Sequence, residues 1–244
     1  MGTLEARIYG LPLSMMNQLT TLGRQYNLAD ANTCSLYAYE EGQSPSPVFT
    51  GTISLASADM TGAPAARLRV SAHAGCSEAV KPVMPATVQG SQDVSELMRQ
   101  IAHKAGLKFE DGDVNTKIMN PYLLGGARGQ AMAIANAAGI GWIIDRGTLA
   151  IWPRGGARPG DAPPISPQTG LVGDPRFNQA GVALTTLYNP NIEYAGKVEV
   201  PSDLKPACGT WSVVDIDHEL ESETPKGKRF TTISTSLLDV QNRP

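Results

Sequence analysis

The sequence has no long apolar run, few aromatic residues and only three cysteines, and these absences exclude several classes of protein. No stretch approaches the ~20 apolar residues that cross a bilayer, and the first residues lack the features of a secretory signal. Cys34, Cys76 and Cys208 include no C-x-x-C pair, which fits neither a disulfide framework nor a zinc ribbon. We therefore expect no membrane partner, assembly in a cytoplasm, and three reduced, buried thiols.

Concentrated positive charge is also missing. The 20 lysines and arginines are scattered, and the formal net charge is −3. Binding along a phosphate backbone requires a basic patch or stripe. Sequence-specific nucleic-acid binding is therefore not expected.

Motifs for catalysis, metals and cofactors are absent too. The sequence has no G-x-S-x-G, Walker loop or complete G-x-G-x-x-G, and Gly139-Ile-Gly141 is interpreted as a helix end followed by a strand start. His73 and Cys76 could supply two metal ligands, but a polar strand-end histidine beside a buried thiol is the simpler interpretation. His103 is expected on the exposed side of a helix. We predict no catalytic residues, no metal and no cofactor.

The sequence is instead rich in turn-forming residues. It has 25 glycines and 18 prolines but only 6% aromatics, which favours many short strands joined by tight turns. A short helical turn is expected near Leu13 to Thr20. Strand patterns cover residues 5–9, 33–39, 48–55, 66–72, 182–188, 192–200, 211–220 and 230–237.

The middle of the chain changes to helical spacing. Apolar residues from Val94 to Ala105 predict an amphipathic helix, with Ser91 as a candidate N-cap and Gly106 as its end. A strand near residues 107–109 and a second helix over 130–138 are expected to follow. These elements predict a small α/β part.

A hairpin is predicted after the second helix. Residues 142–144 and 148–152 form its strands, and Gly147 can adopt the left-handed conformation that a tight loop needs. Trp142 and Trp152 resemble a sugar-stacking pair only loosely, and we interpret them as a cross-strand pair in the core.

Residues 154–170 are so rich in glycine and proline that no core is expected from them. The predicted division is a first β module over 1–88, an α/β domain over 89–153, a connector over 154–170 and a second β module over 171–244. The predicted fold class is α+β: mainly β, with an α/β insertion.

Five acidic residues at every second position form the most unusual local pattern. If they lie on one strand, the carboxylates of Asp215, Asp217, Glu219, Glu221 and Glu223 project from one face and repel one another. Pairing with Lys228 and Arg229 across a hairpin explains them without a ligand. A hard-cation site and an acidic wall of a channel for a polyanion are two further interpretations.

Seven segments together resemble the tail hub proteins of contractile bacteriophage baseplates, which are related to late-control D proteins and to the N-terminal modules of type VI secretion spikes. The segments follow the family's order over essentially the whole chain. They are LPLSMMNQLTTLG (11–23), VFTGTI (48–53), AVKPV (79–83), GTLAIWPRGG (147–156), ISPQTGLVGDP (165–175), TLYNP (186–190) and GTWSVVDIDHELESETPKG (209–227).

The resemblance implies a structural, non-enzymatic subunit of a homotrimeric hub, assembled in the bacterial host cytoplasm and located in the virion tail baseplate. Each subunit would contribute two tail-tube-like β-barrel modules to a pseudo-sixfold ring, with the small α/β domains at its periphery. The ring would join the tail tube to the spike and leave a passage for DNA, which would be its only contact with nucleic acid. The acidic strand would face this channel or a subunit interface.

One departure from the family concerns the first barrel. Relatives of this kind carry further β structure before the segment that matches Leu4 to Gly10. Either Met1 is an internal start, or a neighbouring subunit completes the barrel by satisfying the edge near Glu5 to Tyr9.

Two other functions compete with this hypothesis. A cell-wall binding module would use the α/β part with Trp142 and Trp152. A tail-associated wall hydrolase would use acids such as Glu219 and Glu221.

Overall fold

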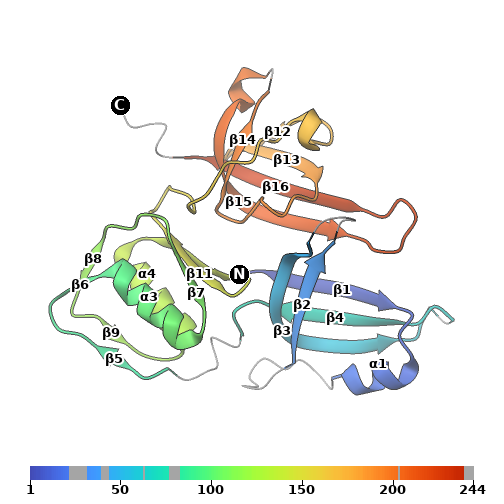
Figure 1. Ribbon diagram of the computed structural model, residues 1–244, viewed down its shortest axis with the longest axis horizontal. Coiled ribbons are helices and arrows are strands. Elements are labelled where there is room, and N and C mark those ends of the chain that lie inside the picture. Colours follow the sequence, from blue (N-terminus) through green and yellow to red (C-terminus); the bar gives the residue numbers. More distant parts are fainter. Residues whose placement is uncertain (22–31, 40–43, 63, 77–82, 203, 239–244) are drawn as a thin grey trace. The chain divides into compact units, whose positions relative to one another are not determined.

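The computed structural model describes residues 1–21, 32–39, 44–62, 64–76, 83–202 and 204–238 (Figure 1). The chain forms two compact units. The first contains Met1–Phe109 and Asn115–Ala150, and the second contains Glu110–Val114 and Ile151–Pro244. The four-part division predicted from the sequence stays a prediction.

The N-terminal part of the first unit is a curled four-stranded antiparallel sheet, which we call the N-sheet (Figure 1). Its strand order is β1-β4-β3-β2. Helix α1 follows β1 in the chain and contacts β3. The elements are β1 (Thr3–Tyr9), α1 (Leu13–Leu19), β2 (Thr33–Ala38), β3 (Ser46–Asp59) and β4 (Arg67–His73).

Strand β3 accounts for the curl of the N-sheet. Its first part pairs with β2 and its second part with β4, and the register shifts between Ile53 and Leu55. Such a bulge bends a strand and increases its twist. Gly51 lies close to the point where the two pairings meet, and a Cβ atom there would approach the His73 carbonyl oxygen to 2.6 Å. A glycine is therefore required where β4 crosses β3 so closely.

The apolar side of the N-sheet is covered in part by α1. Met16 is the one buried residue of this helix and packs with Ala56, Leu68 and Val70, while Phe49 packs with Ala72 and Ala74. The predicted strands and helical turn are confirmed. β3 is longer than predicted at both ends.

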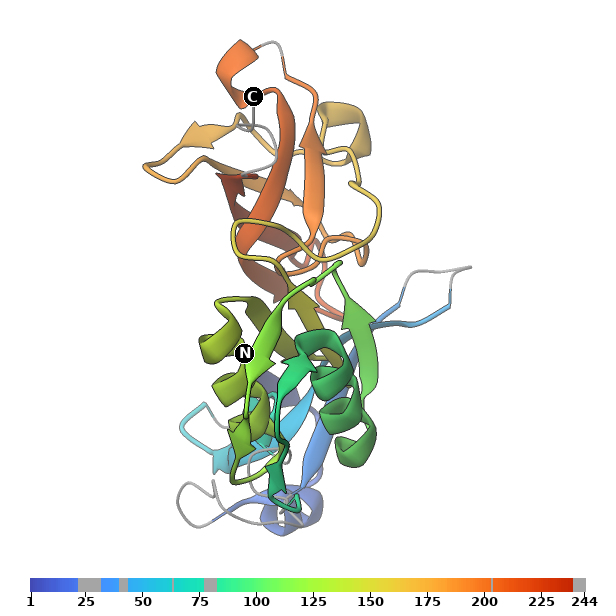
Figure 2. The same ribbon diagram turned by 90° about the vertical axis from the view of Figure 1, so that its left-hand side faces the viewer.

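The rest of the first unit carries helices α3 and α4, which pack against each other, and the last residues of the neighbouring strands β7 and β11 belong to the second unit (Figure 2). Short strands pair around them as β5-β9 and β6-β8, and a three-stranded sheet has the order β10-β11-β7. The elements are β5 (Ala86–Thr87), β6 (Ser91–Asp93), α3 (Val94–Ala105), β7 (Lys108–Asp111), β8 (Lys117–Met119), β9 (Tyr122–Leu123), α4 (Ala127–Ala138), β10 (Gly141–Asp145) and β11 (Thr148–Trp152).

Both helices stop at the predicted glycines, but α4 begins at Ala127 rather than at the predicted Gln130, and the predicted N-cap of α3 needs correction. Gly106 and Gly139 are left-handed C-caps, at φ of 72° and 65°. The N-cap of α3 is Asp93, whose side chain accepts from the Glu96 N–H at 3.1 Å. The prediction of Ser91 as the cap is wrong because Ser91 pairs in β6 with Met119.

The predicted hairpin is confirmed, but its tryptophans are not a core pair. Arg146 and Gly147 both have positive φ, as a two-residue type I′ turn requires. Trp142 and Trp152 are only half-buried, and the Trp152 ring makes an edge contact with Tyr194 at 6.4 Å between centroids. The prediction that the two indoles pair in the core is therefore wrong.

The second unit contains a five-stranded antiparallel sheet, which we call the C-sheet, with the order β12-β13-β16-β15-β14. Its core includes Val182, Leu184, Trp211 and Ile233. The elements are η1 (Pro167–Thr169), β12 (Arg176–Phe177), β13 (Val182–Leu187), β14 (Lys197–Val200), η2 (Lys205–Ala207), β15 (Gly209–Leu220) and β16 (Arg229–Leu237).

Two predictions for this unit need correction. The strand predicted over 192–200 begins only at Lys197, because Ala195 has a positive φ of 59° in a turn. The glycine- and proline-rich segment does contribute to a core: Ile165 is 1% exposed and packs with the C-sheet. The prediction that this segment contributes to no core is therefore wrong, because composition could not predict where a single isoleucine packs.

The chain is thus mainly β with three described helices, which confirms the broad fold class. In the described part of the chain, no helix has the length and apolar character needed to span a membrane.

Candidate assembly surfaces of the two sheets

The N-sheet and the C-sheet have the same strand order. The strands of the N-sheet lie side by side in the order β1-β4-β3-β2, so the first strand in the chain is followed by the fourth, the third and the second. The C-sheet repeats this order in β13-β16-β15-β14, and β12 is added outside β13. In both sheets the third strand is the longest and carries the register shift, between Ile53 and Leu55 or between Val213 and Asp215. The two sheets therefore share one strand order, in which β1 holds the same position as β13.

The polar face of the N-sheet carries arginines and carboxylates. Asp59 binds Arg67 at 2.9 Å and also pairs with Arg69. Hydrogen bonds from the Thr61 hydroxyl and backbone N–H, and then from Arg67, hold the pKa of Asp59 well below its usual range. The hydroxyl of Ser71 donates to Glu5 at 2.7 Å.

Arg7 differs from its neighbours on this face. It lies directly opposite Arg69 in the register of β1 and β4, and it is exposed. Like charges directly opposite each other destabilise a strand pair. Among the described residues, no ion pair is found for Arg7.

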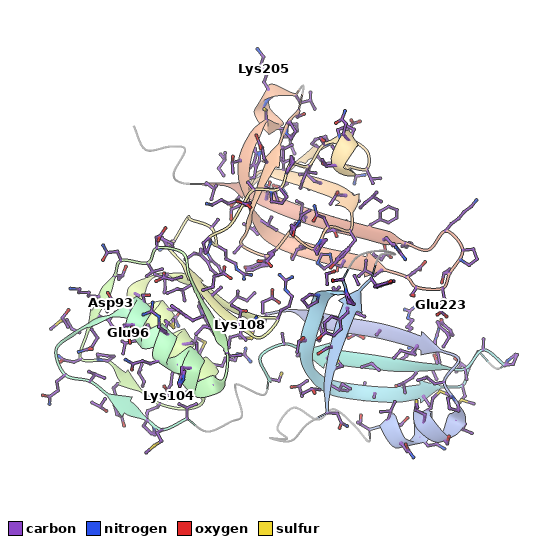
Figure 3. The ribbon with its side chains drawn as sticks, in the orientation of Figure 1. Asp93, Glu96, Lys104, Lys108, Lys205 and Glu223 are labelled. Carbon is purple, nitrogen blue, oxygen red and sulfur yellow. The ribbon has the colours of Figure 1, made fainter. Side chains whose placement is uncertain are left out.

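The polar face of the C-sheet carries three acids along β15, next to the small side chains of Thr232 and Ser234 and the larger Phe230 on β16. Asp215 lies opposite Ser234, Asp217 opposite Thr232 and Glu219 opposite Phe230, and all three acids are exposed. Glu221 and Glu223 lie past the strand end at Leu220, and Glu223 has a φ of 58° in the turn (Figure 3). The prediction that all five acids share one strand face is therefore wrong for these two.

Lys228 neutralises part of the acidic pattern, as predicted for a hairpin. Its ammonium binds Glu219 at 2.6 Å and its backbone N–H donates to Glu221 at 3.1 Å. The hydrogen bond to Glu219 raises the pKa of Lys228. Arg229 lies opposite Leu220. In the structure as described, Asp215 and Asp217 have no ion-pair partner, and no group of three or more His, Cys, Asp or Glu could hold a metal.

In the C-sheet, β14 and β13 are covered on their outer sides by segments of the same chain. On β14, Ile165 donates to the Glu199 carbonyl at 2.7 Å and Glu199 donates to that of Pro163 at 3.1 Å. On β13, Val172 donates to Thr185 at 2.8 Å, and β12 pairs beyond it. Residues 163–177 therefore satisfy backbone groups that an exposed edge would leave unpaired.

The N-sheet has fewer such covers. Thr21 donates to the Ala56 carbonyl at 2.7 Å, and the Thr20 hydroxyl accepts from Ala58 at 3.2 Å, so the end of α1 covers the second part of β3. In the described ranges no strand pairs with the outer edge of β1. The part of β15 from Asp215 to Leu220 likewise has β16 on one side only, since β14 ends opposite Gly209–Ser212.

A buried ion cluster holds the segment that covers β14. Arg158 is 4% exposed, and its guanidinium donates to both Glu110 oxygens at 2.8 and 2.7 Å. It also lies 3.3 Å from Glu193, and its backbone N–H donates to the Ala195 carbonyl at 2.7 Å. Sequence reasoning missed this cluster because its members lie far apart in the chain and form no motif.

The three cysteines and three histidines lie in different surroundings from one another. The thiols are free, but Cys34 and Cys76 are half-buried and Cys208 is exposed, so the prediction of three buried thiols is wrong. Burial raises the pKa of the Cys34 thiol. His103 is exposed on α3 as predicted, and His73 ends β4. His218 bonds Thr231 at 2.9 Å, with its ring edge against Tyr188.

Solved structures with a similar fold come from phage tails and a related secretion system. A tail protein of Neisseria meningitidis MC58 aligns with a TM-score of 0.56 and 13% identity over 82% of each chain. The 43 kDa tail protein of prophage MuSo2 from Shewanella oneidensis aligns with a TM-score of 0.53 and 12% identity, over 99% of this chain and 90% of that chain. The chain therefore has the fold of a phage tail protein.

A third similar structure is the c3393 protein of E. coli, described as a type VI secretion component that resembles the T4 tail proteins gp27 and gp5. It aligns with a TM-score of 0.53 and 11% identity, over 83% of this chain and 63% of that one. No curated protein sequence matches the chain significantly. The family model described as Baseplate hub gp41 matches residues 21–235. The chain belongs to this family of baseplate hub proteins.

Proposed function

We propose that three copies of the chain form a ring that joins the tail tube to the central spike and surrounds the DNA passage. Family membership supports the place of the chain in the baseplate and its contact with other tail proteins. The ring, its symmetry and its passage are the proposal.

The repeated strand order is the observation that carries the proposal. Each chain brings two sheets with the same order and the same position of the bulge. Three copies would therefore present six similar modules around one axis. Such a ring could match a sixfold tube on one side and a threefold spike on the other, with each curled sheet as one part of a barrel wall.

The polar face of the C-sheet suits either a channel wall or an interface. Asp215 and Asp217 stand beside small side chains such as Thr185, Thr232 and Ser234. Acidic groups on a channel wall would repel a passing polyanion and prevent adhesion.

A structural role is favoured over catalysis. Glu219 and Glu221, the acids suggested for a wall hydrolase, are exposed and bonded to Lys228. A general acid needs an environment that raises its pKa, such as an apolar pocket. Trp142 and Trp152 are half-buried, and the Trp152 ring contacts Tyr194, so these rings are less available to a sugar than exposed ones would be.

The native mass of the purified full chain tests the proposal. A ring of three copies has three times the mass of the 25.8 kDa chain. A species of that mass, with the monomer present only on dilution, is the expected result. A chain that stays monomeric at all accessible concentrations would overturn the proposal.

A further inference from the structure

We infer that the outer edge of β1 in one copy lies against the uncovered part of β15, Asp215 to Leu220, in the next copy. This inference rests on the proposed ring and assigns the acidic strand to the contact between subunits. In a ring built from two alternating modules, the N-sheet of one copy has a C-sheet of another copy as its neighbour. Each of these two strand edges would then find a partner.

The two sheets differ in how the outer edge of their first strand is covered. In the C-sheet, β12 and Val172 cover the outer edge of β13. A further strand can therefore pair at this position of the sheet. The corresponding edge of β1 has no such strand among the described residues. An uncovered edge is a template for pairing with another chain.

The charged side chains at the two edges also favour this contact. At the β1 edge, Arg7 faces Arg69 of its own copy and finds no ion-pair partner in the described structure. At the β15 edge, Asp215 and Asp217 are exposed and also unpaired in the described part of the chain. The unpaired charges at these positions are therefore of opposite sign. Placing carboxylates beside Arg7 would offset its repulsion from Arg69.

The side chains that alternate along β1 and β15 match each other in one register. An antiparallel register that sets Arg7 opposite Asp217 also sets Ile8 opposite Ile216 and Leu4 opposite Leu220. Ile8, which is 40% exposed in a single copy, would gain an apolar neighbour. Glu5 would face Glu219, whose charge is already compensated by Lys228 at 2.6 Å.

A competing explanation is that Asp215 and Asp217 only protect an exposed edge from aggregation, since charged side chains at an edge discourage pairing. The two explanations predict different effects of charge reversal. If the acid only protects the edge, its replacement by a residue of opposite charge leaves association unchanged. If the acid pairs with Arg7 of the next copy, the same replacement weakens association.

The test is a charge swap in the full chain, with association followed by light scattering over a dilution series. Arg7→Asp and Asp217→Arg should each weaken association at least about tenfold, because each places like charges together at the contact. The combined variant should restore association to near that of the unmodified chain.

Neither change is expected to harm the fold. An aspartate at position 7 would face Arg69 in its own copy, and position 217 faces Thr232 on an exposed surface. Circular dichroism checks this point. Arg176→Asp on β12 is the matched control, an exposed arginine at the outermost strand of the other sheet, and should leave association unchanged.

The outcomes separate this inference from the ring itself. A monomeric unmodified chain would overturn the ring. An intact oligomer that neither single variant weakens, or single losses that the combined variant does not restore, would overturn the β1–β15 contact and leave the ring standing.

Discussion

The two sheets share a strand order but differ in how their edges are finished. In the described structure, residues 163–177 cover the outer sides of β13 and β14 in the C-sheet and leave part of β15 open, whereas the outer edge of β1 in the N-sheet is uncovered. The strands of both sheets are marked by the alternating apolar pattern in the sequence. The edge cover comes from irregular segments that differ between them. The flanking segments therefore decide where each sheet keeps an open edge among the described residues: at β1 in the N-sheet, and at Asp215 to Leu220 of β15 in the C-sheet.

The largest expected effect comes from breaking the cluster that holds the cover on β14. Arg158→Ala should lower the free energy of unfolding by about 3–5 kcal/mol, because it leaves Glu110 and Glu193 in a partly buried site without their cation. Urea unfolding followed by fluorescence measures this loss. Arg69→Ala in the N-sheet, where the arginine is 54% exposed, should cost less than about 1 kcal/mol. Equal losses would show that the cover on β14 is not specially stabilised.

A smaller loss is expected from the apolar anchor of the same segment. Ile165→Ala should cost about 2–4 kcal/mol, because the side chain is 1% exposed in the C-sheet core. Thermal unfolding of this variant would be compared with that of Ile8→Ala, which changes a 40% exposed residue of β1 and should alter stability by less than about 0.5 kcal/mol. If Ile165→Ala is as mild as Ile8→Ala, the segment is only a linker.

The curl of the N-sheet can be tested at Gly51. Gly51→Ala should destabilise the chain by about 1–3 kcal/mol, because the new Cβ would approach the His73 carbonyl to 2.6 Å. Gly129→Ala in α4 is the control: its nearest neighbour is 3.7 Å away, and alanine should stabilise the helix by about 0.5–1 kcal/mol. Differential scanning calorimetry of both variants checks the signs. A neutral Gly51→Ala would mean that β3 and β4 can separate at no cost.

The smallest effects concern the β3–β4 hairpin of the N-sheet and the β15–β16 hairpin of the C-sheet. The stability of each hairpin should change at an opposite end of the pH scale. The pKa of Asp59 is lowered, so its contribution is present above the unfolded carboxyl pKa of about 3.9 and is lost as pH falls through the folded value. The pKa of Lys228 is raised, so its contribution is present below about 10.4 and is lost as pH rises through the folded value. Amide hydrogen exchange in each hairpin across pH measures both.

Two substitutions serve as controls for this difference. Asp59→Asn should remove the acid response of the β3–β4 hairpin, and Lys228→Gln the alkaline response of the β15–β16 hairpin. A response that persists in either variant would contradict the assignment of the titrating group.

Sequence periodicity predicted most elements of the fold because burial of one face leaves a clear signal. The helix from Val94 to Ala105 and the strand from Trp211 to Leu220 are found as predicted, apart from small shifts in their ends. The pattern failed where local backbone geometry decides. Ala195, with a positive φ, delays β14, and Leu220 ends β15 before Glu221 and Glu223 can join the strand face.

The assembly surfaces were predictable only in part. The alternating acids marked β15 as unusual, and pairing with Lys228 was anticipated from the hairpin. The unpaired state of Arg7 and the cover from residues 163–177 could not be read from one sequence, because both depend on which strands become neighbours. The Arg158 cluster was unpredictable for the same reason, since Glu110 and Glu193 lie far from it in the chain.

The most direct test of the central claim is an electron-microscopic average of the purified assembly viewed along its axis, with no symmetry imposed. Three repeats, each with two similar densities around an open centre, are the predicted result. Two unlike densities per repeat, a closed centre, or a number of copies other than three would contradict the account.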